Sequence, residues 1–341
     1  MNMKFDQLIA TGGIGLGILF ESNNNRSLDR NESRLAVLKE SKDYCKQHII
    51  LHYIASVLSN ELHVYAIGMV GEDDSGIRLI KKMQSVGINT DMVGQTSTLP
   101  TMFSVCFQYP DKCVCNITTS NSACKLVTPQ YIHQNIEAKQ LIITDRTLIL
   151  AVPEVSVETR LALLNEGKSH LAFCVASILC DEAKEFINGG GIELCDLLSI
   201  NETEAKVIAN VKSNEIESII VGCSNYLSKI NPEISLIVTC GEKGSYSFYR
   251  GKIEHIPARK ANPISTAGAG DAYIAGVICG LSMGLPFQNN GEKDCITLRA
   301  TDLGSFFAEK SVESEHTITE EIDRTLLNNF MKQEGVLFYG I

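Results

Sequence analysis

Short apolar runs alternate along the chain with longer segments whose apolar residues have helical spacing. The run Leu148-Ile149-Leu150-Ala151-Val152 is apolar throughout, as expected for a strand covered on both faces. This alternation, with short links, predicts a mostly parallel sheet with helices on both faces. The parallel strands are expected at 63–70, 148–152, 171–175, 197–200 and 236–239, and the helices at 44–58, 157–167, 181–187, 215–229 and 298–312.

Two pairs of runs depart from this rhythm and predict antiparallel hairpins. Thr101–Gln108 and Lys112–Thr118 flank the turn residues Tyr109-Pro110-Asp111. Ser245–Tyr249 and Lys252–Ile256 form the second pair.

The first 60 residues are less regular. An apolar segment at 5–18, broken by a glycine-rich turn, predicts a buried strand, and the polar segment 21–34 predicts a long loop. Leu35–Lys42 fits a short strand or helix. Asp43 is then expected as the N-cap of the helix 44–58.

Composition and charge exclude several classes of protein. The 341 residues are 44% hydrophobic, which is enough for a large core, and no shift in composition marks a linker, so a single domain over 1–341 is expected. The net charge of −10 disfavours nucleic-acid binding. Neither an 18-residue apolar run nor a signal peptide is evident. A cytoplasmic protein with no membrane segment is therefore expected.

Twelve cysteines are scattered with no Cys-x-x-Cys, which predicts reduced, mostly buried thiols. A zinc site built from Cys106, Cys113, Cys115 and Cys124 is the alternative, although the spacing is irregular.

The stretch Ile264–Tyr273 carries the clearest candidate chemistry. Gly268, Ala269 and Gly270 run directly into Asp271, and a small-residue apolar helix is expected to follow. Such a turn lets the backbone approach a ligand, and the free amides of a helix start bind anions. Asp271 makes sense there as a base beside a phosphate under attack, or, in the simpler alternative, as a helix N-cap. The glycine-rich segment 12–17 does not complete the phosphate-binding pattern Gly-x-Gly-x-x-Gly, because Ile18 stands where the third glycine belongs. No rival phosphate motif therefore appears.

Together with three other motifs, this stretch resembles the ribokinase-like (PfkB-type) family of carbohydrate kinases over about residues 5–330. The four motifs are Gly68-Met69-Val70-Gly71-Glu72-Asp73 with Gly76, Asn201-Glu202-Thr203-Glu204, Val238-Thr239-Cys240-Gly241-Glu242-Lys243-Gly244, and Thr266-Ala267-Gly268-Ala269-Gly270-Asp271-Ala272-Tyr273.

The resemblance implies a phosphoryl-transfer site. Asp271 would take the proton of the acceptor hydroxyl, and the amides of Gly268, Ala269 and Gly270 would form an anion hole. Asn201 and Glu204 would help to hold Mg²⁺ and phosphate, mostly through water, unless they are only a helix cap and its partner. The residues expected along ATP are Thr239, Gly241, Lys243 and Gly244.

The sequence also departs from the family. Ser265 stands where the signature usually has the aspartate associated with a monovalent cation, which puts potassium activation in question. The family's sugar-binding Asp is replaced around Gly17-Ile18. The family's Gly-Gly-x-x-x-Asn motif corresponds to residues 43–48 of this chain. An Asp–Tyr pair stands there in place of the two glycines, and His48 in place of the asparagine.

Because these family residues are replaced, the residues that contact the acceptor are predicted from this sequence alone. His48 and His52 have a spacing that can bind a metal, but no third ligand is evident. The expected substrate contacts are Asp43, His48, Arg30, Arg34 and, more weakly, Asn121, with solvated loop charges and an N-cap as the alternative.

The sequence thus predicts a doubly wound α/β fold with a small β lid from parts of 12–40 and 98–120, closing over the acceptor. The expected activity is ATP- and Mg²⁺-dependent phosphorylation of a hydroxyl on a sugar, polyol or nucleoside-like small molecule. The alternative is a non-catalytic ligand-binding or regulatory relative that retains the fold. Exposed edges of the lid strands favour a homodimer through the lid.

Overall fold

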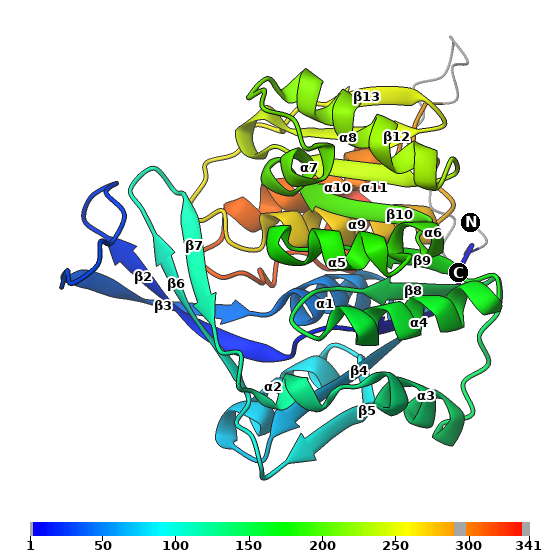
Figure 1. Cartoon of the computed structure of the whole chain (residues 1–341), viewed down its shortest axis with the longest axis horizontal. Coiled ribbons are helices and arrows are strands. Elements are labelled where there is room, and N and C mark those ends of the chain that lie inside the picture. The colour runs from blue at the N-terminus through cyan, green and yellow to red at the C-terminus, as the bar shows by residue number, and fades with distance from the viewer. Residues whose placement is uncertain (1–2, 290–297, 336–341) are drawn as a thin grey trace.

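The computed structural model describes residues 3–289 and 298–335, and its centre is a sheet of nine strands (Figure 1). The strand order is β13-β12-β11-β10-β9-β8-β1-β4-β5. The strands from β5 to β11 in this order pair in parallel, and β12 and β13 extend the sheet antiparallel. Their bounds are β1 Gln7–Thr11, β4 His63–Gly71, β5 Asn89–Thr96, β8 Thr147–Ala151, β9 Phe173–Ala176, β10 Leu197–Asn201, β11 Ser235–Thr239, β12 Ser245–Tyr249 and β13 Lys252–Ile256.

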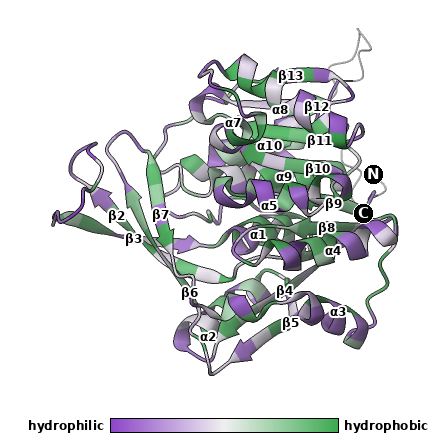
Figure 2. Cartoon of the chain, in the orientation of Figure 1, coloured by the Kyte–Doolittle hydropathy of each residue, from purple (hydrophilic) through white to green (hydrophobic). Residues whose placement is uncertain are grey.

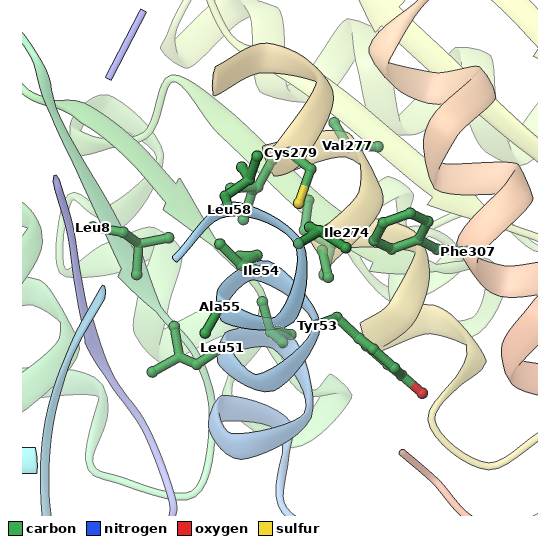
Figure 3. Close-up of a cluster of buried hydrophobic side chains, with 14 of the residues drawn as sticks. Leu8, Leu51, Tyr53, Ile54, Ala55, Leu58, Ile274, Val277, Cys279 and Phe307 are labelled. Atoms are coloured by element: carbon green, nitrogen blue, oxygen red, sulfur yellow. The ribbon is translucent and has the colours of Figure 1, made fainter. Parts of the chain in front are cut away.

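Helices cover both faces of this sheet because successive strand side chains point to opposite sides. In β1, Leu8 and Ala10 belong to one hydrophobic core and Ile9 to the other. Figure 3 shows part of the first core, where Ile54 packs near Ile274. Burying one such side chain contributes roughly 1.5–3 kcal/mol. The predicted doubly wound α/β fold is confirmed.

The helices are α1 Lys46–Leu58, α2 Asp74–Ser85, α3 Pro129–Ala138, α4 Val157–Ser169, α5 Ala183–Asn188, α6 Gly191–Leu194, α7 Glu202–Ala209, α8 Ile216–Ile230, α9 Ala269–Ser282, α10 Ala300–Val312 and α11 Arg324–Gln333. Short 3₁₀ turns lie at Ala123–Leu126, Cys180–Glu182 and Gly241–Lys243. The first core includes side chains of α1, α9, α10 and α11, and the second includes those of α4 and α8. Helices α3 and α11 were not predicted, because α3 buries only Ile132 and Ile136, and α11 only three residues.

A second sheet, called the lid sheet below, projects from the α/β body (Figure 1). Its order is β3-β2-β6-β7, with β2 paired parallel to β6 and the other pairs antiparallel. Figure 2 shows hydrophobic and polar residues mixed along these strands, whereas the central strands are mostly hydrophobic. The bounds are β2 Gly15–Ser22, β3 Ala36–Tyr44, β6 Met102–Gln108 and β7 Val114–Thr118, so the predicted hairpin is present.

The prediction for the start of α1 is wrong. Asp43 is not the N-cap: it lies in β3 opposite Gly17 of β2, and the helix begins at Lys46 after Cys45. Strand pairing with β2 outweighs the local capping preference of Asp43. The preceding segment, for which strand and helix were both open, is therefore strand.

The parallel strands bring their carboxyl ends to one edge of the sheet, where α/β proteins bind ligands. The last residues of β1, β8, β10 and β11 are Thr11, Ala151, Asn201 and Thr239. None of the helices within residues 3–289 and 298–335 is both long and apolar enough to span a bilayer.

Candidate active site

The turn that is expected to bind an anion, residues Gly268 to Gly270, forms the start of α9 and is called the anion-binding turn below. Gly268 has φ +80°, and a Cβ there would lie 2.8 Å from the carbonyl oxygen of Thr317, so both backbone and space require glycine. At Gly270 a Cβ would meet no described atom within 4 Å, so this side of the turn is open. The amides of a first helical turn have no partners in the helix. The Ala269 amide is already engaged, at 3.3 Å, by the carbonyl of Thr266.

Asp271 lies in the first turn of α9 and forms an ion pair with Lys46 of α1. The Nζ–Oδ1 distance is 3.1 Å, and the two side chains are 32% and 13% exposed, respectively. The packing of α1 against α9 brings these residues together across 225 positions of sequence. Sequence reasoning missed Lys46. Its signal was a lysine at a helix start, where the helix dipole disfavours positive charge.

Lys46 is surrounded by further carboxylates. The Asp271 carboxylate raises the pKa of Lys46 well above its ordinary value, and Glu204 and Glu154 add to the effect. The pKa of Glu204 is raised, mainly by burial, while the amide of Asn201 and the Lys46 ammonium act in the opposite direction. Carboxylates from three segments that are distant in sequence therefore favour the charged form of Lys46.

Glu154 was also missed. It follows β8, has φ +78°, and its Oε2 is buried without a hydrogen-bond partner among the described residues. Burial raises its pKa to about 7, although Lys46 acts in the opposite direction. A left-handed conformation is uncommon for a non-glycine residue and occurs often at functional sites. The only sequence signal was a charged residue shortly after the predicted strand 148–152, separated from it by Pro153.

Asn201 and Glu204 form a capping box at the start of α7. The Glu204 amide donates to Asn201 Oδ1 at 2.9 Å, and the Asn201 amide donates to Glu204 Oε2 at 2.7 Å. Asn201 and Glu204 therefore do form the helix cap that was considered as the alternative to a cation site. This cap does not exclude a cation role, because it uses only Oε2 of Glu204 and leaves Oε1 outside the cap. Oxygen donors of this kind fit Mg²⁺, which binds largely through water.

The expected nucleotide residues follow β11. Thr239 is the last residue of that strand, and the 3₁₀ turn Gly241–Lys243 follows. Gly244 has φ +87°, and a Cβ there would lie 2.1 Å from the carbonyl oxygen of Ile256. The Lys243 side chain is exposed, while its carbonyl contacts the ring of His255 at 2.8 Å.

Asp43 reaches the same region from the lid sheet. Ser104 Oγ and Cys106 Sγ contact Asp43 Oδ2 at 3.0 and 2.9 Å, respectively. Burial raises the pKa of Asp43, and the charge of Asp271 adds to this effect, which the thiol and hydroxyl only partly offset. Asp43 is therefore the predicted acceptor residue that the structure brings close to Asp271.

His48 lies in the core. It is fully buried between the rings of Tyr44 and His52, with centroid distances of 4.6 and 5.9 Å, and burial lowers its pKa to about 3. This placement gives no support to a substrate contact. No group of three or more potential metal ligands, at the histidine pair or at the four cysteines, occurs within the described ranges.

The remaining candidates lie away from Asp271. Arg34 is held within the 23–35 loop by Glu32 at 2.8 Å and by the carbonyl of Ser27 at 3.2 Å. Arg30 and Asn121 are exposed. No contact in the described part of the chain links these three residues to Asp271 or Lys46.

Comparisons of the sequence with known proteins agree on one family. Residues 50–298 match the family described as pfkB family carbohydrate kinase. The deoxyribokinase of Salmonella typhi is 27% identical over 220 residues, covering 62% of this chain and 66% of that protein. The fructokinase of Klebsiella pneumoniae is 32% identical over 96 residues, covering 28% and 29%, respectively. The chain thus spans no more than about two thirds of these relatives.

Solved structures extend the likeness to nearly the whole chain. Ribokinase from Giardia lamblia superposes with a TM-score of 0.78 at 16% identity, covering 95% of this chain and 99% of that one. Arabidopsis thaliana ribokinase, complexed with ribose and ATP, has a TM-score of 0.71 at 18% identity and covers 96% and 99%. At such identities the structures show a shared fold.

Proposed function

Because the chain belongs to the pfkB family of carbohydrate kinases, we propose that it transfers a phosphoryl group from ATP to a hydroxyl of a sugar, polyol or nucleoside-like small molecule. The observation that supports this most is the placement of Asp271 in the first turn of α9, directly after the Gly268–Gly270 turn and 3.1 Å from Lys46. That arrangement combines a base, anion-binding amides and a cation, which phosphoryl transfer requires.

In the proposed mechanism Asp271 accepts the proton of the acceptor hydroxyl as the hydroxyl oxygen attacks the terminal phosphoryl group of ATP. The bond from that phosphorus to the bridging oxygen breaks, and ADP leaves. The open amides of the turn bind the oxygens on which charge develops. Lys46 orients the Asp271 carboxylate and supplies positive charge beside it. The ion pair with Asp271 holds Lys46 there, and Glu204 and Glu154 further favour its charged form.

Mg²⁺ bound to ATP would neutralise phosphate charge and fix the phosphates in line with the acceptor. Asn201 and Glu204 would hold its water ligands, and Thr239, Gly241, Lys243 and Gly244 would lie along the nucleotide. Asp43 and Glu154 would accept hydrogen bonds from acceptor hydroxyls. Both carboxylates are desolvated, so a donor from the substrate would compensate for their burial.

The proposal is tested by ADP release with Mg-ATP and a panel of sugars, polyols and nucleosides. Wild type should release ADP with at least one acceptor, and Asp271→Asn should lower kcat roughly 10²–10⁴-fold, the range for loss of a general base. ATP binding, measured by calorimetry with a non-hydrolysable analogue, should survive the substitution.

Two outcomes would count against the proposal. Unchanged turnover in Asp271→Asn would remove Asp271 as the base. Tight binding of an acceptor without turnover in wild type would instead favour a ligand-binding relative, the alternative suggested by the altered residues at 43–48.

A further inference from the structure

Two hydrogen bonds join the tip of the lid sheet to the segment that leads into α9. Gln108, the last residue of β6, donates from Nε2 to the carbonyl of Ile264 at 3.1 Å. The hydroxyl of Thr266 donates to the carbonyl of Lys112 at 2.7 Å. The partners are 156 and 154 residues apart in sequence, so folding alone brings the lid tip to this segment.

On the lid side, the contact is made by a well-defined turn. Lys112 donates its amide to the Tyr109 carbonyl at 2.8 Å, and its φ of +67° sets the direction of its own carbonyl. The Asp111 amide donates to Asn25 Oδ1 at 3.1 Å, and Lys112 Nζ lies 3.8 Å from Glu21 Oε1. These bonds fasten the turn to β2 and its loop, so the tip moves with the rest of the lid sheet.

In the segment that leads into α9, Thr266 takes part in two hydrogen bonds. Its hydroxyl contacts the lid, and its carbonyl accepts from the amide of Ala269, the first residue of α9. The preceding residues are fixed separately, because the amides of Ile264 and Ser265 donate to the carbonyl of Val312 at 2.7 and 3.3 Å. The hydroxyl and the carbonyl of Thr266 therefore connect the lid tip directly to the anion-binding turn.

We propose that Thr266 and Gln108 are positioning residues that couple docking of the lid sheet to the geometry of the anion-binding turn. The proposal rests on the kinase function proposed above. With the lid docked on an acceptor, the two bonds hold the turn beside Asp271 and keep water out of the site. Without them, acceptor binding no longer steadies the turn, and phosphoryl transfer to the acceptor slows.

Matched substitutions at one position separate this role from a structural one. Thr266→Val keeps the shape and removes the donor, whereas Thr266→Ser keeps the donor. We expect Thr266→Val to lower kcat/KM for the acceptor about tenfold, the upper end for the loss of one intramolecular hydrogen bond, and Thr266→Ser to stay within about twofold of wild type. The dissociation constant of a non-hydrolysable ATP analogue should be unchanged in both, and Gln108→Leu should behave like Thr266→Val. Equal kinetics for the valine and serine variants would overturn the proposal.

A second measurement does not depend on activity. Hydrogen exchange of free wild type should show that the 109–113 turn is protected, and Thr266→Val should accelerate exchange there at least severalfold, while Thr266→Ser should not. Thr144→Val is the matched control, because among the described residues the Thr144 hydroxyl bonds within its own loop, accepting from the amide of Arg146 at 3.1 Å. Identical exchange in the two Thr266 variants would overturn the proposal. A wild type that turns over no acceptor would refute the kinase function, and the exchange result would still decide whether Thr266 joins the lid to the turn.

Discussion

At the scale of single residues, Glu154 is an acid held where its charge is disfavoured. Burial raises its pKa from the ordinary 4.5 to about 7. Between these values the folded chain keeps a proton that the unfolded chain releases. The contribution of Glu154 to the free energy of unfolding is therefore most favourable below pH 4.5 and is lost as the pH rises to about 7.

Glu154→Gln should remove this part of the pH dependence. We expect the variant to gain stability relative to wild type as the pH rises through this window, by roughly 1–3 kcal/mol at pH 8. Urea denaturation at half-unit steps from pH 4 to 8 measures the difference. Glu137→Gln, at an exposed position of α3, is the control and should run parallel to wild type. A Glu154→Gln profile parallel to wild type would show that burial does not shift this acid.

At the scale of elements, the turn between β11 and β12 contains two glycines that differ in one respect. Both have positive φ, +57° at Gly241 and +87° at Gly244, but only Gly244 is crowded by the backbone of β13. Gly241→Ala should cost about 1 kcal/mol for the left-handed backbone alone. Gly244→Ala should cost at least about 2–3 kcal/mol, because the β11–β12 turn must also move away from Ile256.

Thermal and urea denaturation of the two glycine variants tests this difference. Affinity for a non-hydrolysable ATP analogue should fall further in Gly244→Ala, since this turn is expected along the nucleotide. Equal losses of stability at both positions would show that the approach of β13 does not constrain the turn.

At the scale of the whole molecule, the lid sheet exposes apolar residues at its two outer strands. Val37 and Leu38 of β3 are 54% and 57% exposed, and Ile117 of β7 is 71% exposed. Unpaired strand edges that carry such residues favour pairing with another copy of the chain. We therefore expect a homodimer through the lid sheet, with a mass of twice 37.3 kDa by light scattering.

A paired substitution tests this surface. Val37→Lys with Leu38→Lys should shift the mass to that of the monomer, while Ile77→Lys, at an exposed position of α2, should leave the dimer intact. A monomeric wild type, or a dimer that survives the lid substitutions, would contradict the expected interface.

Much of the fold and part of the site could be predicted from sequence, because the deciding interactions are local. The fully apolar strand runs determine a sheet covered on both faces. The capping box of Asn201 and Glu204 depends on residues three positions apart. The positive φ that favours glycine at 268 lies in the backbone of one turn. Confirmation of the family by comparison therefore agrees with motifs that are each shorter than ten residues.

Tertiary structure alone decided the rest of the site. Lys46 meets Asp271 only because α1 packs on α9, and Glu154, which follows β8, interacts electrostatically with both. Asp43 has the local features of a helix cap, but pairing with β2 places it in a strand that leads into the acceptor region. Thr266 touches the lid across 154 residues. Local sequence could specify each of these side chains but not its partner, because the partner is set by the packing of distant elements.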